Sequence, residues 1–217
     1  MKRPLFTPTA DSILRLLLAA GAVLPLGGLV LLMVLARSPL GVGSHEPVHQ
    51  PVQFDHRHHA GDEGLDCRYC HDAVERSASA GLPPTSRCMG CHSQVWNESP
   101  LLEPVRASYF SGQSIPWNRV HRLPDFVFFN HSIHVNKGVG CVTCHGRVDS
   151  MPLVSQQAPL TMGWCLDCHR NPTPHLRPRE AITSMTWRAP GDPAETGRAV
   201  QQALHVEPRT NCTTCHR

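Results

Sequence analysis

All ten cysteines of this chain occur as five C-x-x-C pairs, and a histidine follows each pair immediately. C-x-x-C-H is the attachment signature of c-type haem. The two thiols bond to the two vinyl groups on one side of the porphyrin, and the adjacent imidazole binds the iron as its proximal ligand. The five motifs are Cys67, Cys70 and His71; Cys88, Cys91 and His92; Cys141, Cys144 and His145; Cys165, Cys168 and His169; and Cys212, Cys215 and His216.

Paired cysteines have three other common uses. A disulfide framework suits a secreted, cysteine-rich chain, but it gives no reason for a histidine after every pair. Zinc ribbons contain C-x-x-C knuckles without an obligatory following histidine, and a thioredoxin-like dithiol occurs once, within an α/β pattern. Because five matches of one form use every cysteine, the sequence predicts five covalently bound haem c groups.

Two copies of the pattern F-x-H-x-x-H provide candidates for the second iron ligands. They begin at Phe54 and Phe129, and the haem motifs after them recur at offsets of 74 and 77 residues. We therefore predict two copies of a dihaem module, 54–97 and 129–170. Histidines three residues apart on a helical turn project to one side and reach two different irons. By analogy, we assign the second and proximal ligands as His56 with His71, His59 with His92, His131 with His145, and His134 with His169.

The fifth haem, on His216, needs a second ligand from elsewhere in the chain. Met151 follows the third haem motif closely, and Met162 lies three residues before Cys165. We predict one His/Met haem with either methionine as its ligand, since a thioether raises the potential relative to two imidazoles. The remaining candidates are His205, His121 and His175, and His121 is also a candidate to bind a haem propionate.

The run 16–36 has 21 consecutive residues without a polar or charged side chain. As a helix rising about 1.5 Å per residue it spans roughly 31 Å, which matches a hydrocarbon core. Lys2, Arg3 and Arg15 precede it, so the positive-inside rule places 1–15 in the cytoplasm. The alternative is a signal peptide cleaved after Ala36, but the apolar part of a signal is usually ~7–15 residues. We expect an uncleaved anchor in the inner membrane of a bacterium, with the haem domain on the periplasmic side.

The composition indicates a core that is largely cofactor. Only 41% of the 217 residues are hydrophobic and 6% are aromatic, and 20 are proline. We expect a multihaem cytochrome c that is mostly irregular, with short helices around stacked haems near 67–77, 88–97 and 165–169, plus one N-terminal transmembrane helix. A linker (37–53), a connector (98–128) and a strap that ends in the fifth haem motif (171–217) complete the predicted organisation, and proline makes the strap irregular over 171–208.

The net charge of +3 does not indicate a nucleic-acid partner. Four basic residues and one acidic residue flank the apolar run, and without them the chain has 16 basic and 16 acidic residues. No basic stripe of the kind that phosphate binding needs remains. Nucleic acid is therefore excluded as the main partner.

The motifs and the phrases between them resemble known families. F-x-H-x-x-H followed by C-x-x-C-H is similar to the class III cytochromes, the c3 and c7 group. The strings FDHRHHAGDEGLDCRYCHDAV, LPPTSRCMGCH, IPWNRVHRLPDFVFFNHSIHV, PLTMGWCLDCHRNP and CTTCHR resemble the pentahaem cytochrome subunit of alternative complex III over about 54–217. This resemblance implies a quinol-oxidising complex with iron–sulfur and integral membrane subunits, which passes electrons through this subunit to a soluble cytochrome c, a copper protein or an oxidase.

Three classes of function are compatible with a membrane-anchored multihaem chain. A reductase of the nitrite-reducing kind usually marks its active haem by a changed motif, such as Lys in place of histidine, and all five motifs here are regular. A quinol dehydrogenase of the NapC/NrfH type carries its first haem directly after the anchor, whereas 37–66 intervene here. Six-coordinate irons leave no open position for a substrate. We therefore expect an electron-transfer subunit of a respiratory or photosynthetic complex, with no bond chemistry of its own.

Overall fold

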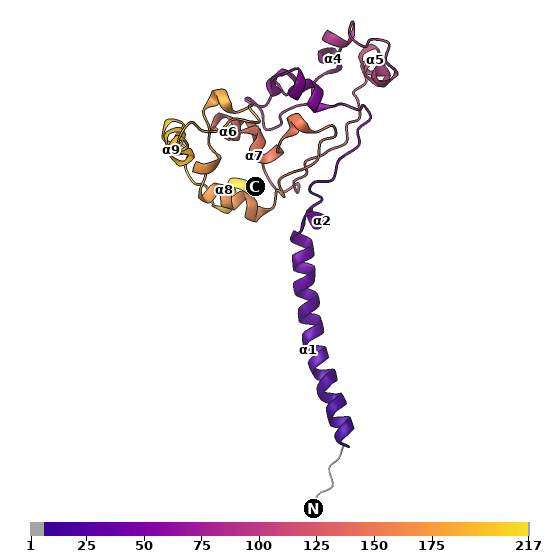
Figure 1. The fold of residues 1–217 in the computed structure, drawn as a ribbon, viewed down its shortest axis with the longest axis vertical. Coiled ribbons are helices and arrows are strands. Elements are labelled where there is room, and N and C mark those ends of the chain that lie inside the picture. The colour runs from indigo at the N-terminus through magenta and orange to yellow at the C-terminus, as the bar shows by residue number, and fades with distance from the viewer. Residues whose placement is uncertain (1–6, 217) are drawn as a thin grey trace, which may run out of the picture. The chain divides into compact units, whose positions relative to one another are not determined.

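The computed structural model describes residues 7–216, and the chain divides into two compact units that meet between Gly43 and Ser44. The first unit contains α1 (Pro8–Arg37) and the short α2 (Pro39–Val42) (Figure 1). Within the described residues one helix, Thr9–Arg37, is long and apolar enough to cross a membrane, with a mean hydropathy of 2.4. Lys2 and Arg3, on which the predicted orientation depends, lie outside the described residues.

Helix α1 extends beyond the apolar run at its N-terminal end because the preceding residues are good helix starters. The Thr7 hydroxyl accepts a hydrogen bond from the Ala10 backbone N–H at 3.2 Å, and proline at the first helical position is preorganised for a helix. The guanidinium of Arg15 then pairs with Asp11 one turn earlier, at 3.0 Å. The first turns of α1 are therefore polar and capped, and the apolar run 16–36 forms the rest of the helix.

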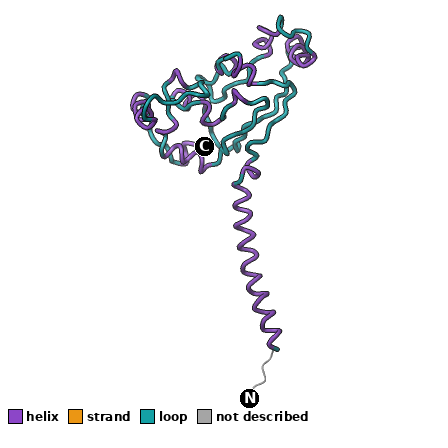
Figure 2. Tube along the Cα trace, viewed as in Figure 1, coloured by secondary structure: helices purple, strands orange, loops and turns teal. Residues whose placement is uncertain are grey.

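The second unit is built from short helices joined by long loops (Figure 2). Between Ser44 and His216 the chain forms no strand, and its sheet-like pairing is limited to isolated bridges such as Pro47 with Ser155 and Val139 with Leu176. In chain order the helices are η1 (Arg57–Asp62), α3 (Cys67–Cys70), α4 (Thr85–His92), η2 (Pro100–Leu102), α5 (Glu103–Ser111), α6 (His131–Asn136), α7 (Cys141–His145), η3 (Val148–Ser150), α8 (Met162–Arg170), η4 (Thr173–His175), η5 (Arg179–Ala181), α9 (Pro193–Ala203) and α10 (Cys212–Cys215).

Each C-x-x-C pair lies on one of these helices: α3, α4, α7, α8 or α10. Residues three apart share a helix face, so the two thiols of each pair project together. The predicted helix over 67–77 ends at Cys70, because the chain then turns with the Val74 N–H bonded to the His71 carbonyl at 3.2 Å. Helix α4 begins three residues before the predicted start at Cys88 and ends at His92. The expected mostly irregular chain with short helices is confirmed.

Two segments outside the haem motifs contain regular helices. The connector holds α5, and the strap, which we expected to be irregular over 171–208, holds the 11-residue α9. Pro193 begins α9 rather than interrupting it, since a proline at the first helical position loses no hydrogen bond. The Asp192 carboxylate accepts from the Ala194 N–H at 2.9 Å and caps the same end. The prediction of an irregular segment was wrong here because a proline interrupts a helix only in its interior and not at its first position.

The apolar core of the second unit is small. Among residues 44–216 seven of the eleven buried apolar residues gather in two clusters, and no large side chain in the described chain is fully buried. One cluster joins Val52 to α4, α5 and Ile115, and the other joins Val74 to α6 and Ile182. Side-chain packing is thus limited for a unit of this size, as the composition predicted.

Candidate haem-binding sites

The two F-x-H-x-x-H copies have the same local geometry. In the first copy the Phe54 ring lies edge-on to His56, with centroids 4.7 Å apart, and stacks on His59 at 4.4 Å. A phenylalanine between two histidines therefore fixes the direction of both rings. The second copy repeats this arrangement: Phe129 lies edge-on to His131 at 4.7 Å and stacks on His134 at 4.6 Å.

Three of the four predicted imidazole pairs face each other at a separation that fits an iron between them. A metal ion lies about 2 Å from each ligating imidazole nitrogen, so two rings on opposite sides of one ion have centroids about 6 Å apart. The observed centroid separations are 6.1 Å for His59 with His92, 6.3 Å for His131 with His145, and 6.0 Å for His134 with His169. These three pairs of imidazoles therefore fit bis-histidine ligation of an iron.

The fourth predicted pair is His56 with His71. Burial, reinforced by the charge of nearby His71, lowers the pKa of His56 to about 4. His56 is consequently neutral near pH 7, which is the form that binds a metal. Its Nδ1 is buried without a hydrogen-bond partner, unlike that of any other predicted ligand in the described chain.

Backbone carbonyl groups hold the Nδ1 atoms of most predicted ligands. A carbonyl oxygen only accepts hydrogen bonds, so each Nδ1 carries the hydrogen and donates the hydrogen bond. Nε2 is left with the lone pair that binds a metal. These carbonyls had no signal in the sequence, because any residue type supplies one. The pairs are His59 with Asp55 (2.9 Å), His71 with Gly81 (2.8 Å), His92 with Val95 (2.9 Å), His131 with Ala78 (2.9 Å), His134 with Asn130 (2.8 Å), His169 with Arg209 (2.8 Å) and His216 with Phe126 (3.3 Å).

His145 departs from this pattern, because a side chain holds its Nδ1. That atom lies 3.1 Å from Nε2 of His121, and the two ring centroids are 4.4 Å apart. This separation is too short for an iron between the rings, so the contact is a direct hydrogen bond. Burial, with the charges of His121 and His131 adding to it, lowers the pKa of His145 to about 3. Burial also lowers the pKa of His121.

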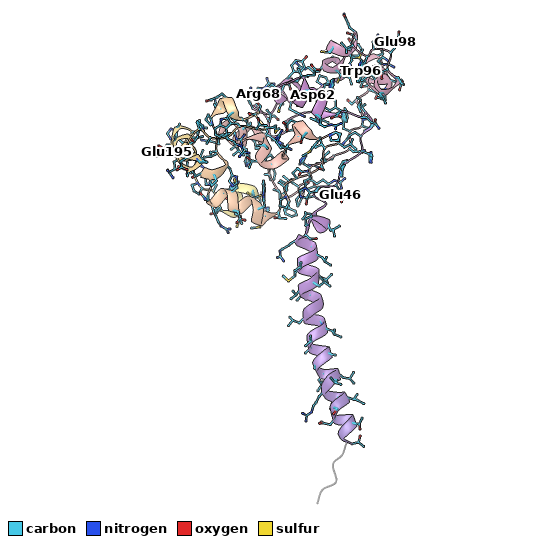
Figure 3. All side chains as sticks on the ribbon, in the orientation of Figure 1. Glu46, Asp62, Arg68, Trp96, Glu98 and Glu195 are labelled. Atoms are coloured by element: carbon cyan, nitrogen blue, oxygen red, sulfur yellow. The ribbon has the colours of Figure 1, made fainter. Side chains whose placement is uncertain are left out.

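His58, the third histidine of the first copy, points elsewhere. Its ring lies nearly parallel to that of the exposed Trp96, with centroids 6.2 Å apart, and its Nδ1 is 3.7 Å from the Asp62 carboxylate. Trp96 and Asp62 are both labelled in Figure 3. The His58 ring also lies edge-on to that of His59, with centroids 5.5 Å apart, so its contacts are with its own module and its surface neighbours.

The ten thiols form no disulfide, and pairs from different motifs lie beside one another. The thiols of Cys67 and Cys141 are joined by a hydrogen bond. Burial raises the pKa of several other thiols, and the charge of a neighbouring thiol raises it further: Cys70 beside Cys88, Cys144 beside Cys168, and Cys165 beside Cys215. The motifs are therefore neighbours in the order second, first, third, fourth, fifth.

The structure brings no predicted second ligand to His216 in the way that it pairs the other imidazoles. The ring neighbour of His216 is Phe126, at 5.7 Å, and the segment 126–128 pairs with the main chain of the fifth motif. Met162 begins α8 and is 66% exposed. Met151 directly follows η3, which packs against η1 in the first module. Met151, Met162 and His205 thus stay predictions for this position.

Part of the chain is similar to known proteins. Residues 127–217 match the family model described as cytochrome c7 and related cytochrome c. The match covers the second F-x-H-x-x-H copy and the last three haem motifs. Residues 127–217 form a cytochrome c7-like multihaem domain. The cytochrome c7-like domain binds haem c covalently, and the resemblance to the c3 and c7 group is confirmed for this part of the chain.

One curated relative is a protein of Nitratidesulfovibrio vulgaris (strain Hildenborough) named menaquinone reductase, multihaem cytochrome c subunit. The two chains are 39% identical over 97 residues, which are 44% of this chain and 45% of the relative. The matched segment therefore spans less than half the length of that relative. The two comparisons thus show a cytochrome c7-like domain over 127–217 and, over the matched 97 residues, similarity to a multihaem cytochrome c subunit.

Proposed function

We propose that the chain is a membrane-anchored pentahaem cytochrome c that relays electrons within a quinol-linked membrane complex. The observation that carries the proposal is the neighbour relation among the thiols, which connects all five motifs, and we propose that they form one unbranched series. Each haem c, when bound, supplies a one-electron couple at its iron. An unbranched series of such sites suits transfer from one end of a domain to the other.

In this proposal the residues of the chain hold the irons and keep them closed to substrates. The proximal ligands are His71, His92, His145, His169 and His216, and the second ligands of the first four are His56, His59, His131 and His134. Met151 or Met162 completes the fifth. The carbonyl partners of Nδ1 keep the imidazoles oriented and in the tautomer that leaves Nε2 free for iron. Six-coordinate iron has no open site, so the chain itself carries out no bond chemistry.

The proposed setting is a complex with iron–sulfur and integral membrane subunits, of the alternative complex III kind. α1 anchors the chain in the inner membrane, with the haem domain on the periplasmic side. Electrons then travel from quinol to a soluble cytochrome c, a copper protein or an oxidase. The name of the Nitratidesulfovibrio relative favours a second candidate, in which electrons travel the other way and reduce menaquinone.

Intact mass of the full chain purified from membranes tests the haem count, and five haem increments are expected. Electron paramagnetic resonance of the same sample should give four bis-histidine signals and one His/Met signal. Fewer than five increments would contradict the pentahaem assignment. The purified subunit should not oxidise menaquinol, and turnover without partner subunits would contradict the relay role. With the intact complex, reduction of the haems by menaquinol supports the first direction, whereas formation of menaquinol from pre-reduced haems supports the second.

A further inference from the structure

Among the described ligands, His145 is the one whose Nδ1 contacts a side chain, that of His121, where seven others contact a backbone carbonyl. Seven predicted ligands direct Nδ1 to backbone oxygens, whereas Nδ1 of His145 meets an imidazole nitrogen at 3.1 Å. The two rings are inclined at 78°. A hydrogen bond between two neutral imidazoles needs one donor and one acceptor. If Nε2 of His145 binds iron, its Nδ1 is the donor and Nε2 of His121 is the acceptor.

The backbone around His121 is fixed on both sides. The Arg119 guanidinium donates to the His121 carbonyl oxygen at 3.1 Å, and the Arg122 N–H donates to the side-chain oxygen of Gln156 at 3.2 Å. Gln156 is 6% exposed, and its own carbonyl accepts from the His45 N–H at 2.7 Å. The segment that carries His121 is therefore held against a buried residue, so its imidazole has a defined position.

We propose that His121 is a positioning residue for the iron ligand His145, and that it acts by accepting a hydrogen bond from the Nδ1–H of that ligand. The proposal rests on the assignment of His145 under the proposed function. Because this hydrogen bond occupies Nε2 of His121, that atom is not free for either role predicted from the sequence, which were to bind an iron or a haem propionate. Outer partners of this kind fix the ring and raise the basicity of the ligand, and their loss typically costs about 10- to 100-fold in metal affinity or activity.

The test compares His121→Phe with His121→Gln in the full chain. Phenylalanine fills the space but accepts no hydrogen bond, whereas the glutamine carbonyl keeps an acceptor. Without the acceptor the imidazole of His145 donates less electron density and stabilises ferric iron less. We expect the reduction potential of one haem to rise in His121→Phe by about 59 mV. For a one-electron couple this corresponds to an about tenfold loss of affinity for ferric relative to ferrous iron. His121→Gln should recover most of this shift.

His49→Phe is the matched control. His49 is exposed and contacts Asn118 through its backbone oxygen, at 2.7 Å, so replacing its side chain should leave all haem signals unchanged. The measurements are a spectroelectrochemical titration, the paramagnetic resonance spectrum and the haem count. A single shifted, still low-spin haem in His121→Phe supports the proposal.

Two results would overturn the role of His121. In one, all potentials and spectra of His121→Phe match those of the wild type. In the other, a new high-spin haem forms, which would make His121 an iron ligand. If His121→Phe loses a haem, His121→Gln decides: five haems with wild-type potentials support an acceptor role, and loss of a haem in this variant too contradicts it. A wild-type chain without a haem on Cys141 and Cys144 would instead contradict the proposed function.

Discussion

The two modules share one local design but anchor it differently. Each places a phenylalanine between two histidines, with ring separations that agree within 0.2 Å. The first histidine of the second module, His131, donates a hydrogen bond from Nδ1 to the Ala78 carbonyl, whereas the buried Nδ1 of His56 has no hydrogen-bond partner. The short motif therefore sets ring direction by itself, and contacts from distant residues decide how firmly each ring is held.

The helices that carry the first motif of each module also differ. Asp66 caps α3 with its carboxylate, which accepts from the Arg68 N–H at 2.8 Å, while Gly140 occupies the same place before α7 and offers no side chain. The Arg177 guanidinium fills the space beside Gly140 and donates to the Ser184 carbonyl at 2.9 Å. The first module thus has a local cap before its helix, whereas the second has Arg177 of the strap beside the corresponding glycine.

The largest expected effect comes from removing one attachment site in each module. Cys141→Ser with Cys144→Ser should lose one haem from the middle of the series, and Cys88→Ser with Cys91→Ser should lose one from its end. Both variants should show four haem increments by intact mass. Rapid-reduction kinetics should show electron transfer between the two ends blocked in the first variant, with four connected haems still exchanging electrons in the second. Equal kinetics in the two variants would disprove the unbranched order.

Removal of the second histidine tests whether the modules are equivalent at the iron. His59→Ala and His134→Ala should each convert one low-spin haem to a high-spin haem, because each ring faces its partner at about the same distance, 6.1 and 6.0 Å. Electron paramagnetic resonance of the two variants provides the measurement. His58→Ala is the control and should leave every haem low-spin. A difference between the two variants would mean that the two modules share their local ring geometry but not their iron coordination.

Gly140→Ala tests the dependence of the second module on the strap. A Cβ at this position would meet the Arg177 guanidinium, so we expect overpacking to cost about 1–3 kcal/mol of unfolding free energy. Thermal unfolding of the full chain in detergent provides the measurement. Gly163→Ala is the control, since no atom lies within 4 Å of its added carbon and alanine favours the helix. Equal loss of stability in both variants would contradict a specific role of Arg177.

The smallest expected effect concerns the local cap of the first module. Hydrogen bonds from Arg68, with others from the Arg68 N–H and Thr183, lower the pKa of Asp66 from 3.8 to about 2. The stabilisation from its carboxylate is complete above pH 3.8 and is lost as the pH falls towards 2. Asp66→Ala should cost about 1 kcal/mol at pH 7 through loss of the cap. Asp66→Asn should keep the cap but remove this acid-dependent part of the unfolding curve. A wild-type acid profile in Asp66→Asn would disprove the assignment.

The parts of the site that depend on short spacings were predictable, and the parts that depend on chain path were not. C-x-x-C-H fixes the thiols and imidazole on one turn, and F-x-H-x-x-H fixes the spacing of two more rings, whereas the pairing of His134 with His169 was assigned by analogy and the structure places their rings 6.0 Å apart. The carbonyl of Arg209 that orients His169 comes from 40 residues further along the chain and has no side-chain signature. The contact of His121 with His145 was missed for the same reason, since one histidine gives no periodic signal.

The contact between Ala78 and His131 has a consequence for how the repeat is divided. The cytochrome c7-like match begins at residue 127, yet the ring and the backbone N–H of His131 are both held by the carbonyl of a residue in the first module, at 2.9 and 3.2 Å. A fragment cut at the boundary of the match would keep its cysteines and lose this anchor. The two modules are therefore not interchangeable, even if they arose by duplication, because a backbone carbonyl of the first module positions an iron-ligand candidate of the second.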